Sequence, residues 1–184
     1  MSKKNTVEIM DPAGLNRTVT RLAHEIVERN RGVEDLVLLG VRTRGVPLAQ
    51  RLNGKIEQIE GKLLPLGVLD VTMYRDDVFK KIKQPVVRTT EIDFDIDGKT
   101  VVIVDDVLYT GRTVRAALDE VIDFGRPTEI QLAVLVDRGH RELPIHADYV
   151  GKNIPTSPGE EVRVQFKEVD DVDGVFLIKS GKVD

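Results

Sequence analysis

Two adjacent carboxylates followed by a short turn containing glycine are the strongest chemical signal in this sequence. Asp105 and Asp106 directly follow the apolar run 101–104, and residues 110–113 read Thr-Gly-Arg-Thr ahead of a helical pattern. A helix that begins at this turn would direct free backbone N–H groups, two hydroxyls and the positive end of its dipole to one spot. That spot suits a phosphate group.

The acidic pair restricts the kind of ligand that this phosphate belongs to. Carboxylates would repel a bare nucleotide anion, but they accept hydrogen bonds from sugar hydroxyls and bind Mg²⁺. A ribose phosphate that also carries a diphosphate has all of these parts. The alternative is structural, because an Asp-Asp pair at a strand end can also be a solvated helix cap. The turn after the pair favours the ligand site.

These residues need a parallel sheet to position them. We expect strands at 36–39, 66–73, 100–104, 130–136, 162–166 and 175–178, and helices at 12–30, 46–59 and 114–124. The alternation predicts an α/β fold with a central, mostly parallel sheet flanked by helices. Ligands bind outside the carboxyl ends of the strands in such sheets, which is where the acidic pair falls.

Composition sets further bounds. The chain has 184 residues, of which 41% are hydrophobic, and we find no repeat or linker, so we expect a single domain over residues 1–184. It has no cysteine and no apolar run long enough to cross a bilayer, so we expect a cytoplasmic protein without membrane contact. A net charge of −4 argues against nonspecific coating of nucleic acid but permits a local basic face.

The apolar strand, acidic pair and turn together resemble the phosphoribosyl pyrophosphate (PRPP) motif of type I phosphoribosyltransferases. The resemblance implies a sheet with a small hood and a flexible arm, and Mg²⁺ that enters with PRPP. It implies that Asp105 and Asp106 hold the ribose hydroxyls and contact the metal as the catalytic pair. The phosphate on the ribose would then lie on the turn, at Thr110, Gly111, Arg112 and Thr113. Purine members usually have a third acidic residue where this chain has Tyr109, which argues for a different base.

Four further segments narrow the resemblance. Residues 40–49, 69–77, 132–145 and 147–157 are similar to the bifunctional pyrimidine operon regulators that are also uracil phosphoribosyltransferases. The implied reaction is uracil plus PRPP giving UMP and diphosphate, through a positively charged ribosyl transition state. The implied second role is binding of pyrimidine operon leader RNA, strengthened by UMP, by a homo-oligomer of two or more chains.

Each implied substrate contact has a plain structural alternative. Thr43, Arg44 and Gly45 would contact the diphosphate, although the same residues could form a simple turn from strand to helix. Tyr74 and Arg75 would belong to an arm that closes over it, or to an ordinary charged loop. Uracil would be recognised beside Arg138, after the fourth strand. The remaining implied contacts are Val107, Leu108, Tyr109 and Val162.

A basic side of the first helix is the candidate RNA surface. At helical spacing it presents Arg17, Thr20, Arg21, His24 and Arg31, opposite an apolar stripe, although Glu28 interrupts it as in an ordinary solvated face. The resemblance adds three residues from elsewhere: His140, Arg141 and Lys152. The family usually has arginine where this chain has His146, so we expect RNA affinity to be weakened above neutral pH.

Two other functions remain open from the sequence. The chain could be a uracil phosphoribosyltransferase with little or no RNA-binding role. It could also act on another base, or be a generic nucleotide-binding α/β domain.

Overall fold

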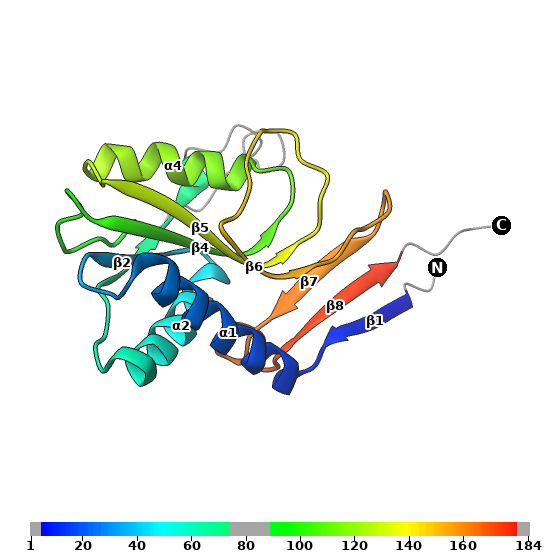
Figure 1. Ribbon diagram of the computed structural model, residues 1–184. Coiled ribbons are helices and arrows are strands. Elements are labelled where there is room, and N and C mark those ends of the chain that lie inside the picture. The colour runs from blue at the N-terminus through cyan, green and yellow to red at the C-terminus, as the bar shows by residue number, and fades with distance from the viewer. Residues whose placement is uncertain (1–4, 74–88, 180–184) are drawn as a thin grey trace.

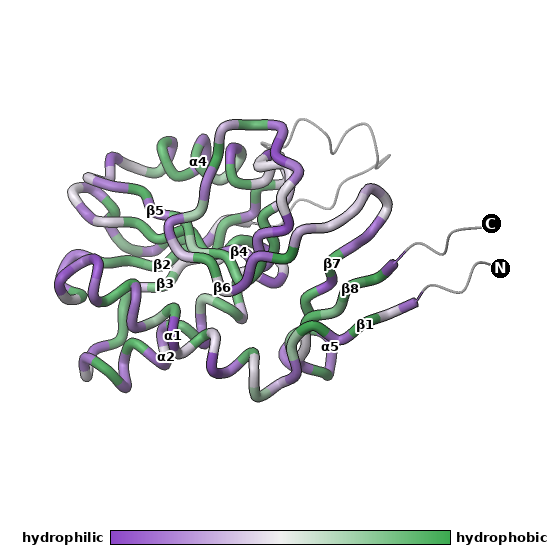
Figure 2. Tube along the Cα trace, turned by 45° about the vertical axis from the view of Figure 1, so that its right-hand side comes forward, coloured by the Kyte–Doolittle hydropathy of each residue, from purple (hydrophilic) through white to green (hydrophobic). Residues whose placement is uncertain are grey.

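A five-stranded parallel sheet forms the centre of the molecule (Figure 1). The computed structural model describes residues 5–73 and 89–179. The strands lie in the order β3-β2-β4-β5-β6, with bounds β2 Leu36–Val41, β3 Leu66–Leu69, β4 Thr100–Leu108, β5 Glu129–Asp137 and β6 Tyr149–Asn153. In Figure 2 the hydrophobic colour follows much of these central strands. Strands covered on both faces are expected to have this apolar composition.

Helices cover both faces of the sheet (Figure 1). Helices α1 (Pro12–Asn30) and α2 (Gly45–Glu60) pack on one face, and α4 (Arg112–Phe124) packs on the other. Asp11 begins α1 as predicted, since its Oδ1 accepts a hydrogen bond of 2.6 Å from the Gly14 N–H. Each face has its own hydrophobic core cluster. The predicted α/β layers are therefore confirmed.

A second sheet joins the two ends of the chain into the expected small hood. It is antiparallel, in the order β1-β8-β7, with bounds β1 Asn5–Met10, β7 Glu161–Gln165 and β8 Gly174–Lys179. The short helix α5 (Lys167–Asp170) connects β7 to β8. Figure 1 shows this sheet beside the central one, with β1 and β8, the first and last described strands, side by side in it.

Several element boundaries differ from those predicted. Strand β4 does not end before the acidic pair but runs on to Leu108, because Asp105 and Val107 still pair with β5. The predicted strand at 66–73 is wrong beyond Leu69, where Val71–Met73 form the 3₁₀ turn η1. Strands β1 and β6 were not predicted.

No helix among the described residues has both the length and the apolar composition needed to span a bilayer.

Candidate phosphoribosyl site

The acidic pair lies near the carboxyl end of β4. Asp105 is buried, and its Oδ1 accepts a hydrogen bond of 2.9 Å from the Asp106 N–H. The half-buried Asp106 in turn accepts one of 2.9 Å from the Val107 N–H. Burial raises the pKa of Asp106 above its ordinary value, against the opposing effects of these hydrogen bonds and of the Arg44 charge. The pair is therefore held in place by its own strand.

The turn at 110–113 is shaped before any ligand arrives. Gly111 adopts φ 92°, a left-handed conformation that favours glycine, and α4 begins at the next residue. The Thr110 carbonyl accepts hydrogen bonds of 2.9 Å from Glu142 N–H and 3.3 Å from Leu143 N–H. The Arg112 side chain pairs with Glu142 at 2.6 Å. These contacts fix the backbone N–H groups at the start of α4.

The second turn, at 42–45, leads from β2 into α2 and packs against β4. A Cβ on Gly45 would lie 2.4 Å from the Val104 carbonyl oxygen. The absence of a side chain at Gly45 thus lets the backbone of this turn pack beside Asp105, and the expected diphosphate contact of Gly45 stays a prediction. Thr43 is exposed, whereas Arg44 is half-buried.

Arg44 bonds a carboxylate of the hood. Its Nε donates to Asp170 Oδ2 at 3.1 Å and its Nη2 to Asp170 Oδ1 at 2.6 Å. The Asp170 hydrogen bonds raise the pKa of Arg44, and the charge of Asp106 adds to the effect. Arg44, the residue expected to bind the diphosphate, thus lies between the hood and the acidic pair.

The expected base-recognition residues form a stack at the end of β5. The Arg138 guanidinium lies 4.1 Å from the centre of the Tyr109 ring, and its Nη2 donates to the Glu160 carbonyl at 2.7 Å. Tyr109 is 44% exposed, so its ring can meet a ligand. Leu108 and Val162 are buried in the cores and Val107 is half-buried. The expected ligand contacts of Leu108, Val107 and Val162 stay predictions, and for the buried Leu108 and Val162 the backbone is the part left to make them.

The comparison with known families decides the class of protein. Residues 7–168 match the family described as phosphoribosyl transferase domain. The chain belongs to the phosphoribosyltransferase family.

Relatives and solved structures of phosphoribosyltransferases agree. The bifunctional protein PyrR of Pelotomaculum thermopropionicum is 58% identical, over 97% of this chain and 99% of that protein. The bifunctional protein PyrR of Clostridioides difficile is 61% identical, over 92% of this chain and 96% of that protein. The hypoxanthine phosphoribosyltransferase of Trypanosoma cruzi superposes with a TM-score of 0.71 at 19% identity, covering 95% of this chain and 97% of that one. That identity shows the type I phosphoribosyltransferase fold alone.

The candidate RNA residues fall into two groups in this phosphoribosyltransferase. Arg17, Arg21 and Lys152 line a groove of about 550 Å³ between β1, α1 and β6, which we call the α1 groove. Arg21 Nη2 donates to the Gly151 carbonyl at 2.6 Å and so joins the two walls of this groove. Its acidic side consists of Glu8 and Asp11.

The other candidates lie outside the α1 groove. His24, His140 and His146 are exposed, and the Thr20 hydroxyl donates to the Asn16 carbonyl at 2.9 Å. Arg141 is turned inward with its side chain 18% exposed, because Asp137 and the Tyr109 carbonyl bind its guanidinium. A phosphate-binding role for Arg141 does not fit this placement.

Some of the residues that hold the site in place carry no recognisable signal in the sequence. Asp170 lies 126 positions from Arg44, inside a run of acidic residues without any motif. Tyr74 and Arg75 lie outside the described residues.

Proposed function

We propose that this chain transfers the phosphoribosyl group of PRPP to uracil, giving UMP and diphosphate, and that it is also a UMP-responsive attenuator that binds pyrimidine operon leader RNA. One observation carries the first part. The acidic pair and a preformed glycine turn meet at the carboxyl end of β4, in a chain 58% identical to a bifunctional protein PyrR over 97% of its length. The same relatives support the second part.

The chemistry at β4 follows from the charges there. Asp105 and Asp106 accept hydrogen bonds from the ribose hydroxyls and stabilise the positive charge that develops on the ribosyl ring. The N–H groups of the turn at 110–113 hold the phosphate. None of these steps needs a general base, so positioning supplies most of the rate.

Magnesium fits this site as a partner of the substrate. The described residues contain no cluster of three or more histidines or carboxylates able to hold a metal ion. Mg²⁺ is often bound by one or two carboxylates plus substrate phosphates, and Asp105 and Asp106 offer two such groups. When bound, the ion neutralises charge on the departing diphosphate.

Uracil is the proposed base because of the residues at the end of β5. Tyr109 stands where purine enzymes usually carry an acidic residue, and its ring stacks with Arg138. Stacking and hydrogen bonds to a planar ring suit a pyrimidine in this position. The test is formation of UMP from radiolabelled uracil with PRPP and Mg²⁺. Failure to form UMP, or equal competition by hypoxanthine or orotate, would count against uracil.

The RNA role is proposed for the α1 groove. Its three cations suit backbone phosphates, and neighbouring polar groups suit unpaired loop bases. Such a regulator works in the cytoplasm, where transcripts emerge, and we propose that it does so as a dimer or larger homo-oligomer. Leader RNA should bind more tightly with UMP at fixed salt, and indifference to UMP would contradict the sensing role.

A uracil phosphoribosyltransferase with little RNA binding is the second candidate. The inward placement of Arg141 favours it, since one expected phosphate contact is missing. Absence of salt-sensitive binding to leader RNA would decide for this candidate.

A further inference from the structure

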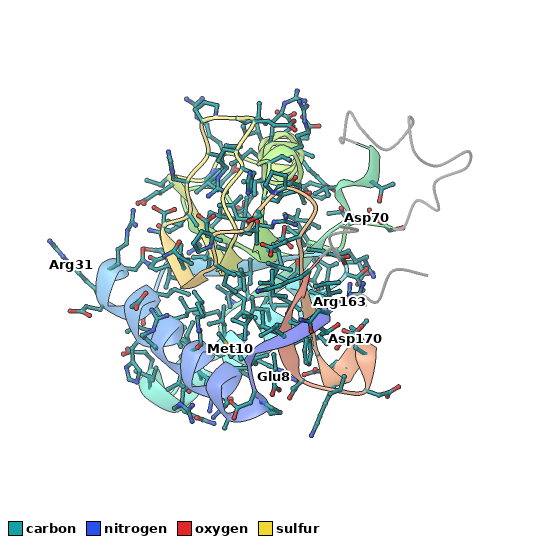
Figure 3. All side chains as sticks on the ribbon, turned by 90° about the vertical axis from the view of Figure 1, so that its right-hand side faces the viewer. Glu8, Met10, Arg31, Asp70, Arg163 and Asp170 are labelled. Atoms are coloured by element: carbon teal, nitrogen blue, oxygen red, sulfur yellow. The ribbon has the colours of Figure 1, made fainter. Side chains whose placement is uncertain are left out.

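The Arg44–Asp170 ion pair bridges the hood and the central sheet. Arg44 stands at the start of α2, and Asp170 ends α5. The Asp170 side chain is 12% exposed and the Arg44 side chain 35% exposed, so the pair is partly screened from water. Figure 3 shows Asp170 on α5 beside Arg163 of β7.

The geometry of this pair fixes the plane of the guanidinium. Asp170 accepts from both Nε and Nη2 of Arg44, a two-point contact that allows little rotation. A guanidinium has five N–H donors; in residues 5–73 and 89–179 Asp170 takes two of those on Arg44, and no hydrogen bond to the other three is found there. Those three can bind the oxygens of a diphosphate.

Without Asp170, Arg44 would have another partner nearby. The neighbouring Gly45 packs against β4, where an added Cβ would lie 3.3 Å from the Asp105 Cα, so Arg44 starts close to the acidic pair. The Arg44 charge also lowers the pKa of Asp106. If Arg44 paired with Asp106 instead, Arg44 would not be free to bind the diphosphate and Asp106 would not be free to bind the ribose. In the described part of the chain Arg44 instead forms its ion pair with Asp170.

Asp170 is itself firmly anchored. Its Oδ2 also accepts a hydrogen bond of 3.0 Å from the N–H of the fully buried Phe166. Arg51 of α2 lies over the Phe166 ring at 5.0 Å and pairs with Glu168 at 2.7 Å. The hydrogen bonds from Arg44 lower the pKa of Asp170, which keeps the carboxylate charged. Helix α5 therefore presents a fixed anion to Arg44.

We propose that Asp170 is a positioning residue, which holds Arg44 in the orientation that receives the diphosphate of PRPP and keeps it from closing onto Asp106. The proposal rests on the proposed transferase function. It assigns to the hood a part in substrate binding, although the hood carboxylate itself touches no substrate.

The test is a double-mutant cycle on the full chain, read by calorimetric binding of magnesium diphosphate. Asp170→Asn should weaken binding about tenfold in the natural background and leave it almost unchanged beside Arg44→Gln. Steady-state kinetics should show a raised KM for PRPP with little change in the KM for uracil. Glu168→Gln is the matched control, since it removes a neighbouring hood carboxylate that pairs with Arg51, and it should leave diphosphate binding unchanged.

The outcomes are distinct. Equal or tighter binding by Asp170→Asn would overturn the proposal, because Asp170 would then be idle or a competitor for Arg44. If Asp170→Asn weakened diphosphate binding equally in the natural and the Arg44→Gln backgrounds, the effect would not pass through Arg44, and the proposal would be overturned. If Asp170→Asn does not fold, Asp170→Ser keeps an acceptor for the Phe166 N–H and is read in the same way. A natural chain that binds no magnesium diphosphate would instead remove the transferase function together with this proposal.

Discussion

Asp106 has a carboxylate whose negative charge is proposed to bind the ribose, and burial makes that charge unfavourable for folding. Burial raises its pKa, which means that the folded chain favours the protonated form more than the unfolded chain does. The contribution of this group to stability is thus fully present below its ordinary pKa of 3.8 and is lost as the pH rises through the raised folded value. A binding site that must stay charged near neutral pH bears this cost.

Replacing Asp106 with asparagine should therefore separate activity from stability. Asp106→Asn keeps the acceptor for the Val107 N–H but removes the charge, so turnover should fall by about 10² or more. The unfolding midpoint at pH 7 should rise by about 3 °C, and this gain should vanish below pH 3.8. Enzyme assays and thermal unfolding at the two pH values measure both effects.

The control is the exposed Asp93, whose change to asparagine should alter neither quantity. Near-normal turnover of Asp106→Asn would contradict the role of this carboxylate.

At the scale of elements, the packing of α2 on β4 joins the two halves of the site. Helix α2 can begin beside Asp105 only because Gly45 has no side chain. The same helix contains Gly54, where an added Cβ would meet nothing within 4 Å. The two glycines of α2 therefore differ in their surroundings: a side chain at Gly45 would collide with β4, whereas one at Gly54 would meet nothing.

Alanine at these two positions should change stability in opposite directions. Gly45→Ala places a methyl group 2.4 Å from the Val104 carbonyl and should cost about 2 kcal/mol of unfolding free energy. Gly54→Ala should add about 0.5 to 1 kcal/mol, because glycine is unfavourable inside a helix. Urea unfolding of the two variants measures the difference. A Gly45→Ala protein as stable as the natural chain would show that the close contact with β4 is relaxed at no cost.

Elements with strong local signals were predictable from the sequence, and elements made by distant pairing were not. The prediction of helix α1 was correct because Asp11 and Pro12 mark its start and apolar residues repeat along it. Strand β1 was missed because most of its residues are exposed and it exists through pairing with β8 at the other end of the chain. Strand β4 was predicted too short, since its backbone pairs with β5 whatever side chains it carries.

The same rule applies to the site. The acidic pair and the turn at 110–113 are contiguous in sequence, so they were identifiable, and the structure brings them to one strand end. The partner of Arg44 was not identifiable, because Asp170 comes close to Arg44 only when the hood has folded. The inward turn of Arg141 likewise depends on Asp137 and on the Tyr109 carbonyl.

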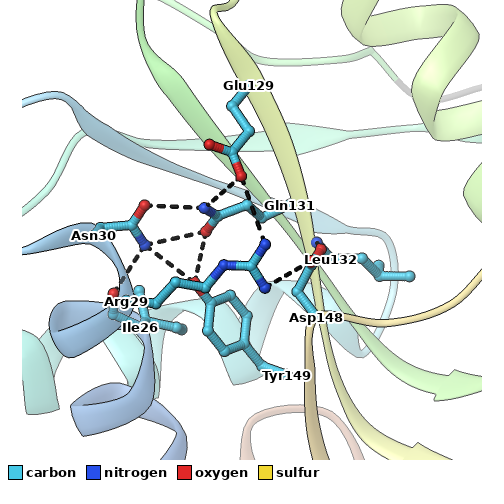
Figure 4. A network of polar contacts seen from close by, with 8 residues as sticks. All are labelled: Ile26, Arg29, Asn30, Glu129, Gln131, Leu132, Asp148 and Tyr149. Carbon is cyan, nitrogen blue, oxygen red and sulfur yellow. Dashed lines mark hydrogen bonds and ion pairs between the residues drawn. The ribbon is translucent and has the colours of Figure 1, made fainter.

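At the scale of the whole molecule, a polar network fixes α1 against the sheet (Figure 4). Asn30 donates from Nδ2 to Tyr149 Oη at 3.1 Å. Its Oδ1 accepts a hydrogen bond of 2.9 Å from Gln131 Nε2. Arg29 pairs with Asp148 at 2.8 Å. The network ties the C-terminal end of α1 to β5 and to β6, the strand that contributes Gly151 and Lys152 to the α1 groove.

Arg17, which lines the α1 groove, offers the sharpest test of RNA binding. Arg17 is exposed, and we find no ion-pair partner for it in residues 5–73 and 89–179, so its charge is available to a phosphate. Arg17→Gln should weaken leader-RNA binding and reduce the salt slope by about 1, while UMP formation stays normal. Arg31→Gln is the matched control, since it removes an exposed charge from the same predicted basic side, at the C-cap of α1 and outside the groove. Equal losses from both variants would mean that only the overall charge of α1 matters and that the groove is not the RNA site.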